Sequence, residues 1–135
     1  MEQENKDIFK SFMDKALKRM DEKKVRKTAK LYIPSLDTDI TVRGLSRAEV
    51  IEVMDVDTSQ DLYAADQYSV YIASVEPDFK KVAAELKEAG KITEPVESVG
   101  IMEIHEMQDV ARKVMELSGV SGKKKVQEVK DSLKN

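Results

Sequence analysis

The part of the sequence that most constrains the fold is the stretch of residues 28–54, which combines two strand patterns with a helix start. The first run places three apolar side chains on one face of an extended segment: Ala29, Leu31 and Ile33. Residues 40–42 alternate in the same way, and residues 34–39 between the two runs are rich in turn formers. This pattern predicts a β-hairpin at about residues 28–43.

A helix is predicted to begin directly after this hairpin. Gly44 breaks the second strand, and Ser46 precedes Glu49 by three residues, which is the spacing of a capping box. In that motif the serine side chain and the glutamate side chain each satisfy a backbone N–H of the other residue. Leu45 and Val50 stand where a hydrophobic staple would place them. Three local rules therefore agree on a helix start at Ser46.

Composition limits the chain to one domain with a modest core. It has 135 residues, of which 36% are charged and 41% apolar, with three Phe, four Tyr, no Trp and no Cys. Without cysteine there is no disulfide framework, thiol nucleophile or cysteine-based zinc site. No apolar run approaches membrane-spanning length and the charged amino terminus lacks a signal-peptide core, so we expect a cytoplasmic protein with no membrane partner.

The net charge of −3 conceals a strong asymmetry along the chain. Residues 1–30 carry +4, residues 31–122 carry −10, and residues 123–135 carry +3. An acidic central body would repel a phosphate backbone, so we expect no nucleic acid partner. The basic ends are most simply solvated segments, although they could touch an acidic partner.

Residues 5–20 show the clearest amphipathic helix pattern in the chain. Its apolar positions recur at spacings of three and four: Ile8, Phe9, Phe12, Met13, Ala16, Leu17 and Met20. The simplest expectation is that this face packs in the core. The alternative is a partner-binding helix, because thioether-rich faces adapt to variable surfaces.

Further helices are predicted in the second half of the chain. Residues 61–75 favour a buried helix with Leu62, Ala65, Ile72 and Val75 as its stripe, although residues 68–75 could instead form a strand. A short helix is predicted from Asp78 to a C-terminal stop at Gly90. A last one is predicted from Ile101 to Ser118-Gly119, with this stripe: Ile101, Ile104, Met107, Ala111, Val114 and Leu117. Residues 126–133 predict only a weak, frayed helix.

Three features could carry chemistry, and each has a simpler interpretation. Residues 55–66 place oxygen side chains at alternate positions as a calcium loop does, but the sixth position is Gln60 rather than Gly and the twelfth is Asp66 rather than Glu. An acidic turn between helices is the simpler interpretation. His105 has no second histidine nearby and is expected to be exposed among acidic neighbours. Three tyrosines, Tyr63, Tyr68 and Tyr71, could offer a stacking surface, but core packing is expected.

The sequence contains no phosphate-binding glycine loop, nucleophile elbow, His–Asp pairing or paired metal ligands. We therefore assign no catalytic, cofactor-binding or metal residue, and expect a protein that acts by binding.

Taken together, the segments resemble the XkdN-like family of phage tail assembly chaperones, found in PBSX-type and related Bacillus prophages. The resemblance covers roughly residues 25–120 and lies in the order and spacing of its segments. These segments are Lys27-Thr28-Ala29-Lys30-Leu31-Tyr32-Ile33-Pro34, Val42-Arg43-Gly44-Leu45-Ser46-Arg47-Ala48-Glu49, Val75-Glu76-Pro77-Asp78-Phe79 and a final helix ending Glu116-Leu117-Ser118-Gly119.

The resemblance implies a non-catalytic role in the bacterial cytoplasm. Such chaperones bind the long, aggregation-prone tape measure protein, keep it soluble, help recruit tail tube protein around it, and are absent from the finished particle. Self-association is possible. Related systems often make a longer product by ribosomal frameshifting, and the lysine codons at residues 123–125 or 134 are where this could occur. The alternatives are a structural tail or connector protein retained in the virion and, less favoured, a calcium-binding regulator.

We therefore expect an α+β, mainly helical fold with an N-terminal helix, one hairpin and about four further helices. Residues 1–24 would form the amphipathic helix and linker, residues 25–120 the core domain, and residues 121–135 a flexible basic tail.

Overall fold

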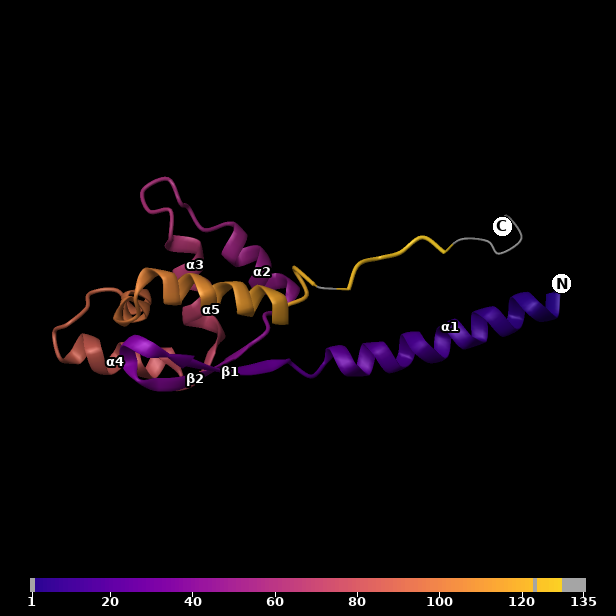
Figure 1. Cartoon of the computed structure of the whole chain (residues 1–135), viewed down its shortest axis with the longest axis horizontal. Coiled ribbons are helices and arrows are strands. Elements are labelled where there is room, and N and C mark those ends of the chain that lie inside the picture. Colours follow the sequence, from indigo (N-terminus) through magenta and orange to yellow (C-terminus); the bar gives the residue numbers. More distant parts are fainter. Residues whose placement is uncertain (1, 123, 130–135) are drawn as a thin grey trace.

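The hairpin and the helix that follows it are present in the computed structural model, which describes residues 2–122 and 124–129 (Figure 1). The elements, in chain order, are α1 (Glu2–Lys23), β1 (Thr28–Ile33), the 3-10 helix η1 (Pro34–Leu36), β2 (Thr38–Arg43), α2 (Arg47–Met54), α3 (Ala64–Ala73), β3 (Ser74–Glu76), α4 (Phe79–Glu88), the 3-10 helix η2 (Pro95–Ile101) and α5 (Ile104–Leu117). The predicted fold class, α+β and mainly helical in one domain, is confirmed.

The sheet has three antiparallel strands in the order β1-β2-β3. Thr28 pairs with Arg43 at one end of the hairpin and Ile33 with Thr38 at the other. For residues 68–75 the sequence allowed either a helix or a strand. The structure has the helix α3 as far as Ala73, and only residues 74–76 form a strand, β3. This strand pairs with β2 and adds a third strand to the predicted hairpin.

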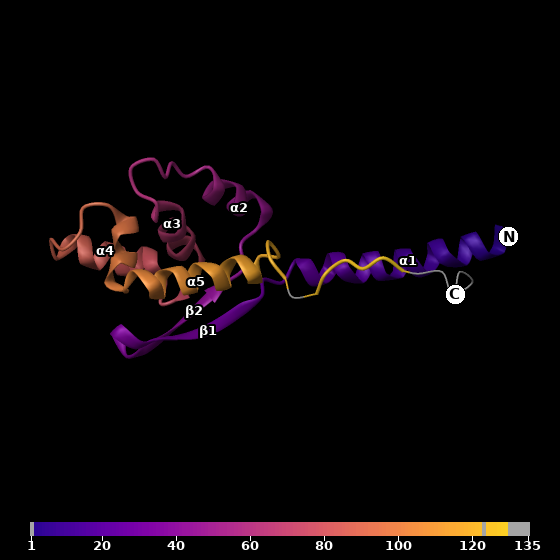
Figure 2. The same cartoon turned by 45° about the horizontal axis from the view of Figure 1, so that its top comes forward.

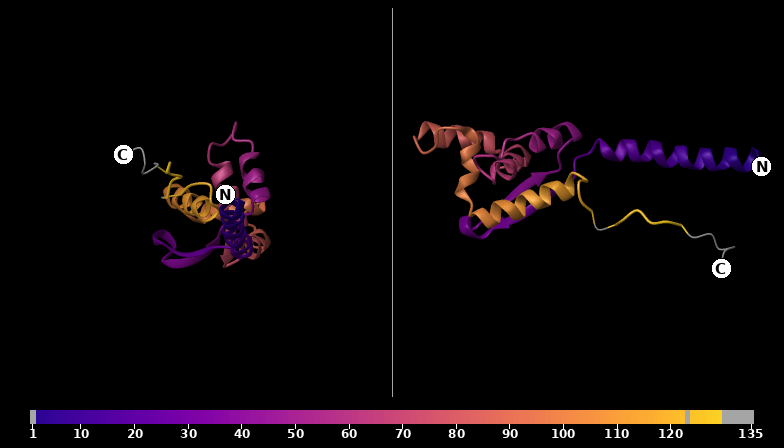
Figure 3. Two further views of the ribbon diagram at one scale, coloured as in Figure 1. Left: turned by 90° about the vertical axis from the view of Figure 1, so that its right-hand side faces the viewer. Right: turned by 90° about the horizontal axis from the view of Figure 1, so that it is seen from above.

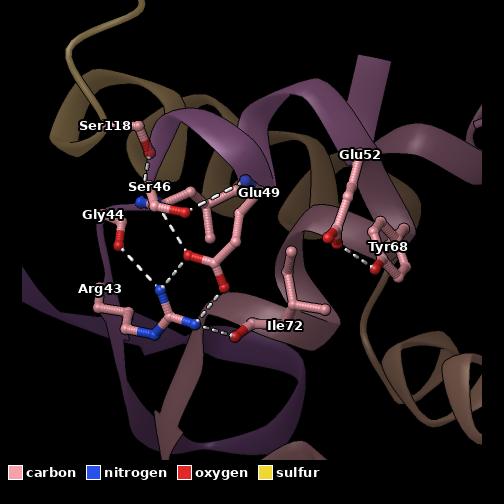
Figure 4. A network of polar contacts seen from close by, with 9 residues as sticks. Arg43, Gly44, Ser46, Glu49, Glu52, Tyr68, Ile72 and Ser118 are labelled. Carbon is pink, nitrogen blue, oxygen red and sulfur yellow. Dashed lines mark hydrogen bonds and ion pairs between the residues drawn. The ribbon is translucent and has the colours of Figure 1, made fainter. Parts of the chain in front are cut away.

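The start of α2 forms the predicted capping box and is fixed to the end of β2 (Figure 4). The Ser46 hydroxyl accepts the N–H of Glu49 at 3.2 Å, and the Glu49 carboxylate accepts the N–H of Ser46 at 2.9 Å. The same carboxylate accepts two bonds from the Arg43 guanidinium, at 2.9 and 2.7 Å. Arg43 also donates to the carbonyls of Gly44 and Ile72, which ties β2, α2 and α3 together.

The core lies between the hairpin and the packed helices α3, α4 and α5, with η2 against α3 and α4. It is built mostly from branched aliphatic side chains, and its one buried large ring is Phe79. The members of the core are Ile33, Ile40, Val42, Leu45, Val53, Val70, Ala73, Phe79, Val99, Met102, Met107, Val110, Ala111 and Val114.

Two of the predicted helix stripes are wrong in part. Leu62 and Val75 are exposed rather than buried, because Leu62 lies before α3 and Val75 lies after it, in β3. Ile101 and Ile104 are likewise exposed, since Ile101 ends η2 and only Ile104 begins α5. Neither belongs to the face of α5 that packs on the core, which is formed by Met107, Val110, Ala111 and Val114.

The predicted ends of α4 and α5 are confirmed. Gly90 follows α4 with a φ of 72°, and Gly119 follows α5 with a φ of 82°. Such left-handed backbone is favourable for glycine, which has no Cβ to clash with the neighbouring carbonyl.

The helix α1 extends away from the rest of the molecule, as the three orientations show (Figures 1, 2 and 3). It spans Glu2–Lys23 and is therefore longer at both ends than the helix predicted over residues 5–20. At the other end, residues 124–129 contain no helix or strand, and the weak helix predicted there is absent from that part. The remainder of that prediction, residues 130–133, lies outside the described residues.

Candidate protein-interaction surface

The apolar face of α1 is uncovered, so the expectation that it packs in the core is wrong. No residue between Glu2 and Lys23 is buried. The exposed fractions are 69% for Ile8, 66% for Phe9, 65% for Phe12, 61% for Leu17 and 62% for Met20. Met13, at 36%, lies on the same stripe. We call the face formed by Ile8, Phe9, Phe12, Met13, Leu17 and Met20 the α1 stripe.

The order of α1 arises from local interactions rather than from packing. Glu2 and Glu4 lie in its first turn and Lys23 in its last, which matches the helix dipole. Exposed local pairs, including Arg19 with Glu22 at 3.5 Å, each add only tenths of a kcal/mol. In folded proteins most of the stability of a helix comes from packing of its amphipathic face, and α1 lacks this contribution. A partner that covers the α1 stripe would therefore also stabilise the helix itself.

The α1 stripe offers considerable apolar surface to a partner. Burying a large aliphatic or aromatic side chain is worth about 1.5–3 kcal/mol. Because the five most exposed members of the stripe retain roughly two thirds of their surface, covering them all would contribute about 5–10 kcal/mol before the entropic costs of association. Ordinary surface leucines are scattered singly, whereas this set is contiguous along one helix face.

A groove of about 510 Å³ lies where α1 joins the body. Its walls come from the C-terminal part of α1 with the following linker, from the loop into α2, and from the end of α5 with the residues beyond it. Apolar side chains from each wall line it: Val25, Leu45, Val50, Leu117 and Val120. We call this feature the junction groove. The sequence did not indicate this groove, because residues 21–24 and the basic residues after them predicted only a solvated linker.

The end of α5 lies very close to Gly44, the residue that follows β2. A Cβ atom at this position would lie 2.5 Å from the carbonyl oxygen of Leu117 and 2.9 Å from its carbonyl carbon. Next to this contact, the N–H of Leu45 donates to the Ser118 hydroxyl at 2.7 Å. The end of α5 is thus packed against the start of α2 with no room for a side chain between them.

The acidic loop between α2 and α3 uses its carboxylates locally. Asp57 accepts the N–H of Ser59 and Asp61 accepts the N–H of Tyr63, both at 2.9 Å. The bond from Ser59 lowers the pKa of Asp57. In the part of the chain that the structure describes, no group of three or more His, Cys, Asp or Glu side chains is placed to hold a metal ion. The calcium alternative therefore depends on the spacing of residues 55–66 alone.

The end of α2 and the loop after it expose a second, smaller set of apolar side chains. Ile51 is 50% exposed, Met54 75% and Leu62 82%, and acidic side chains lie between them along the chain.

Of the three tyrosines, Tyr68 and Tyr71 pack against the core as expected, whereas Tyr63 remains 38% exposed.

His105 is exposed at the start of α5, as expected, and its neighbour Glu106 has a structural role. The Glu106 carboxylate accepts the N–H of Ser35 at 2.9 Å, the Ser35 hydroxyl and the N–H of Glu103. These bonds, that of the Ser35 hydroxyl foremost, lower the pKa of Glu106. The carboxylate thereby joins the tip of the hairpin to the first turn of α5.

Within the described residues, no helix is both long and apolar enough to cross a membrane. No protein-family model matches this chain, and neither the curated proteins nor the solved structures include a significant match to it.

Proposed function

We propose that this chain is a non-catalytic phage or prophage tail assembly chaperone, which binds the tape measure protein during tail morphogenesis and helps recruit tail tube protein. The observation that carries the proposal is the α1 stripe: the exposed apolar face of a long helix in which no residue is buried. The resemblance of residues 25–120 to the XkdN-like family supplies the identity of the partner.

The physical fit is that of one amphipathic helix covering another. A tape measure protein is a long helical protein with exposed apolar stripes, which aggregate when uncovered. An amphipathic helix recognises such a surface through anchors spaced at i, i+3, i+4 and i+7. The α1 stripe has this spacing, and its two methionines allow the contact to adapt as the partner sequence varies along its length.

The energetics suit a chaperone that must later leave. A gross gain of about 5–10 kcal/mol from the α1 stripe would be offset by roughly 4 kcal/mol or more of lost translational and rotational freedom. One copy would therefore hold its partner weakly, and several copies along one tape measure protein would keep it in solution together. Incoming tail tube subunits could displace them one at a time.

Co-expression with the tape measure protein encoded downstream tests the proposal. We expect the tape measure protein to move from the insoluble to the soluble fraction and to co-purify with the chain. A matched variant in which Phe12 and Leu17 are replaced by Asp should lose both effects while its body keeps the same melting temperature, since neither residue is buried. If the tape measure protein stays insoluble with the unmodified chain, the proposal is wrong.

The rival within the same biological setting is a structural tail or connector protein that stays in the virion. Exposed apolar surface suits either role, because a structural protein would cover its α1 stripe permanently. Mass spectrometry of purified particles separates the two: a chaperone is absent from mature particles, and a structural protein is present in stoichiometric amount.

A further inference from the structure

We propose that the junction groove binds an acidic amphipathic segment of a partner protein, with the apolar side of that segment against the aliphatic side chains of the groove and its carboxylates against the cationic ones. This inference rests on the proposed function, to which it adds the chemistry of the partner segment. It concerns a surface distinct from the α1 stripe, so the two can fail separately.

The charge of the side chains that line the groove is the first observation. Five cationic side chains line the groove against a single carboxylate, that of Glu22: Arg19, Lys23, Arg26, Lys27 and Arg47. This is the reverse of the body as a whole, since residues 31–122 carry −10. The helix α1 is itself neutral over residues 2–23, whereas residues 24–30 carry four cations and no carboxylate. The positive charge is thus concentrated at the junction rather than spread along the helix.

Most of these cations have no partner within the described part of the chain. Arg19 pairs with Glu22, but no described carboxylate lies within 4.0 Å of the charged nitrogens of Lys23, Arg26, Lys27 or Arg47. Like charges gathered around one concave surface repel each other, and an incoming carboxylate would relieve this repulsion. The arrangement favours an anionic ligand without first breaking existing ion pairs.

The aliphatic part of the lining distinguishes a protein segment from other anions. It consists of Val25, Leu45, Val50, Leu117 and Val120, side chains with which a free inorganic anion makes no favourable contact. Among the described residues that line the groove there is no Phe, Tyr, Trp or His, and thus no platform on which nucleic acid bases could stack. The acidic body would also repel a phosphate backbone that extended beyond the groove. A segment with aliphatic side chains on one side and Glu or Asp on the other matches both parts of the surface.

A pair of synthetic helical peptides tests the inference. The acidic probe consists of Leu, Ala and Glu over about 15 residues, enough for four helical turns, and the matched probe has Lys in place of every Glu. Binding to the full chain is measured by fluorescence anisotropy of the labelled peptide at low and at high salt. We expect the acidic probe to bind at least about tenfold more tightly than the basic probe, with an affinity that falls as salt rises.

Charge reversal locates the site. Arg26→Glu with Arg47→Glu should weaken binding of the acidic probe by about tenfold or more, as expected from the loss of two close charge pairs. The control is Lys80→Glu with Lys87→Glu on α4, which makes the same change in net charge at exposed positions outside the groove and should alter affinity by less than about twofold. Neither pair makes a side-chain hydrogen bond in the described structure, so both variants should fold, as circular dichroism will check.

In the peptide assay, three results would overturn the inference: equal binding of the two probes, equal effects of the two charge reversals, or tighter binding of a single-stranded oligonucleotide than of the acidic probe. The proposed function has its own readout. If the tape measure protein co-purifies and depends on Phe12 and Leu17 but not on Arg26 and Arg47, the chaperone proposal stands and the groove inference fails.

Discussion

Replacing Gly44 by Ala should destabilise the body substantially, because the added Cβ would meet backbone. Its nearest neighbours would be the carbonyl oxygen and carbon of Leu117 at 2.5 and 2.9 Å, followed by the N–H nitrogen of Ser118 at 3.3 Å. Real Cβ atoms do not approach other atoms within 3.0 Å. A flexible side chain could rotate away, but the end of α5 can make room only by moving as a unit.

The expected cost of this movement is that of overpacking a core, about 2–3 kcal/mol. In a domain of this size each kcal/mol lowers the melting temperature by about 4–8 °C, so Gly44→Ala should melt about 10–20 °C lower. The movement would also separate Leu45 from Ser118, with loss of their hydrogen bond, and would widen the junction groove.

The matched control is Gly100→Ala. Apart from the glycine and its two chain neighbours, no described residue has an atom within 4 Å of a Cβ built there, and the position is exposed, so the change should be within about 0.5 kcal/mol. Thermal and urea unfolding of both variants are followed by far-UV circular dichroism, which reports the helix content. Equal melting temperatures for the two variants would refute the close packing of α5 on the α2 junction.

Three further outcomes are expected. Replacing Phe12 and Leu17 together by Asp should leave the melting temperature of the body unchanged while abolishing partner binding; a drop in melting temperature would mean that α1 packs on its own body. The bonds from Arg43, with those from Ser46, hold the pKa of Glu49 at about 2 against an ordinary 4.5. This carboxylate therefore stabilises the fold above pH 4.5, and its contribution disappears as the pH falls toward 2. Glu49→Gln should flatten that part of the pH profile of the unfolding free energy, measured by urea titration, and an unchanged profile would contradict the bidentate pair. Glu106→Gln should lower the melting temperature at neutral pH by weakening the tie between the hairpin tip and α5, and the difference from the unmodified chain should shrink in acid, because the pKa of Glu106 is lowered in the fold.

Local rules in the sequence predicted the parts of the fold that depend on neighbours along the chain. The capping box at Ser46 and the glycine stops at Gly90 and Gly119 were found because each motif satisfies backbone groups within a few residues. The hairpin followed from alternation, and its paired register confirms that inference. Charge segregation between the ends and the body was also visible from the order of the charged residues along the chain.

The errors concern properties that only the assembled fold decides. Leu62 and Ile104 fitted the helical period, but Leu62 lies in the loop before α3 and Ile104 is the first residue of α5, and both are exposed. The apolar face of α1 was predicted correctly, yet periodicity cannot say whether anything covers such a face. The junction groove brings together residues near 25, near 46 and near 118, so no local pattern could have indicated it.

Hydrogen exchange on the chain alone and in its complex with the tape measure protein tests the central claim most directly. Free α1 has no buried residue and should exchange rapidly along its whole length, whereas the body stays protected. In the complex, the amides of α1 around Phe12 and Leu17 should become strongly protected, because a covered helix no longer frays. If α1 exchanges as fast in the complex as in the free chain, the exposed stripe is not the binding surface and the account is wrong.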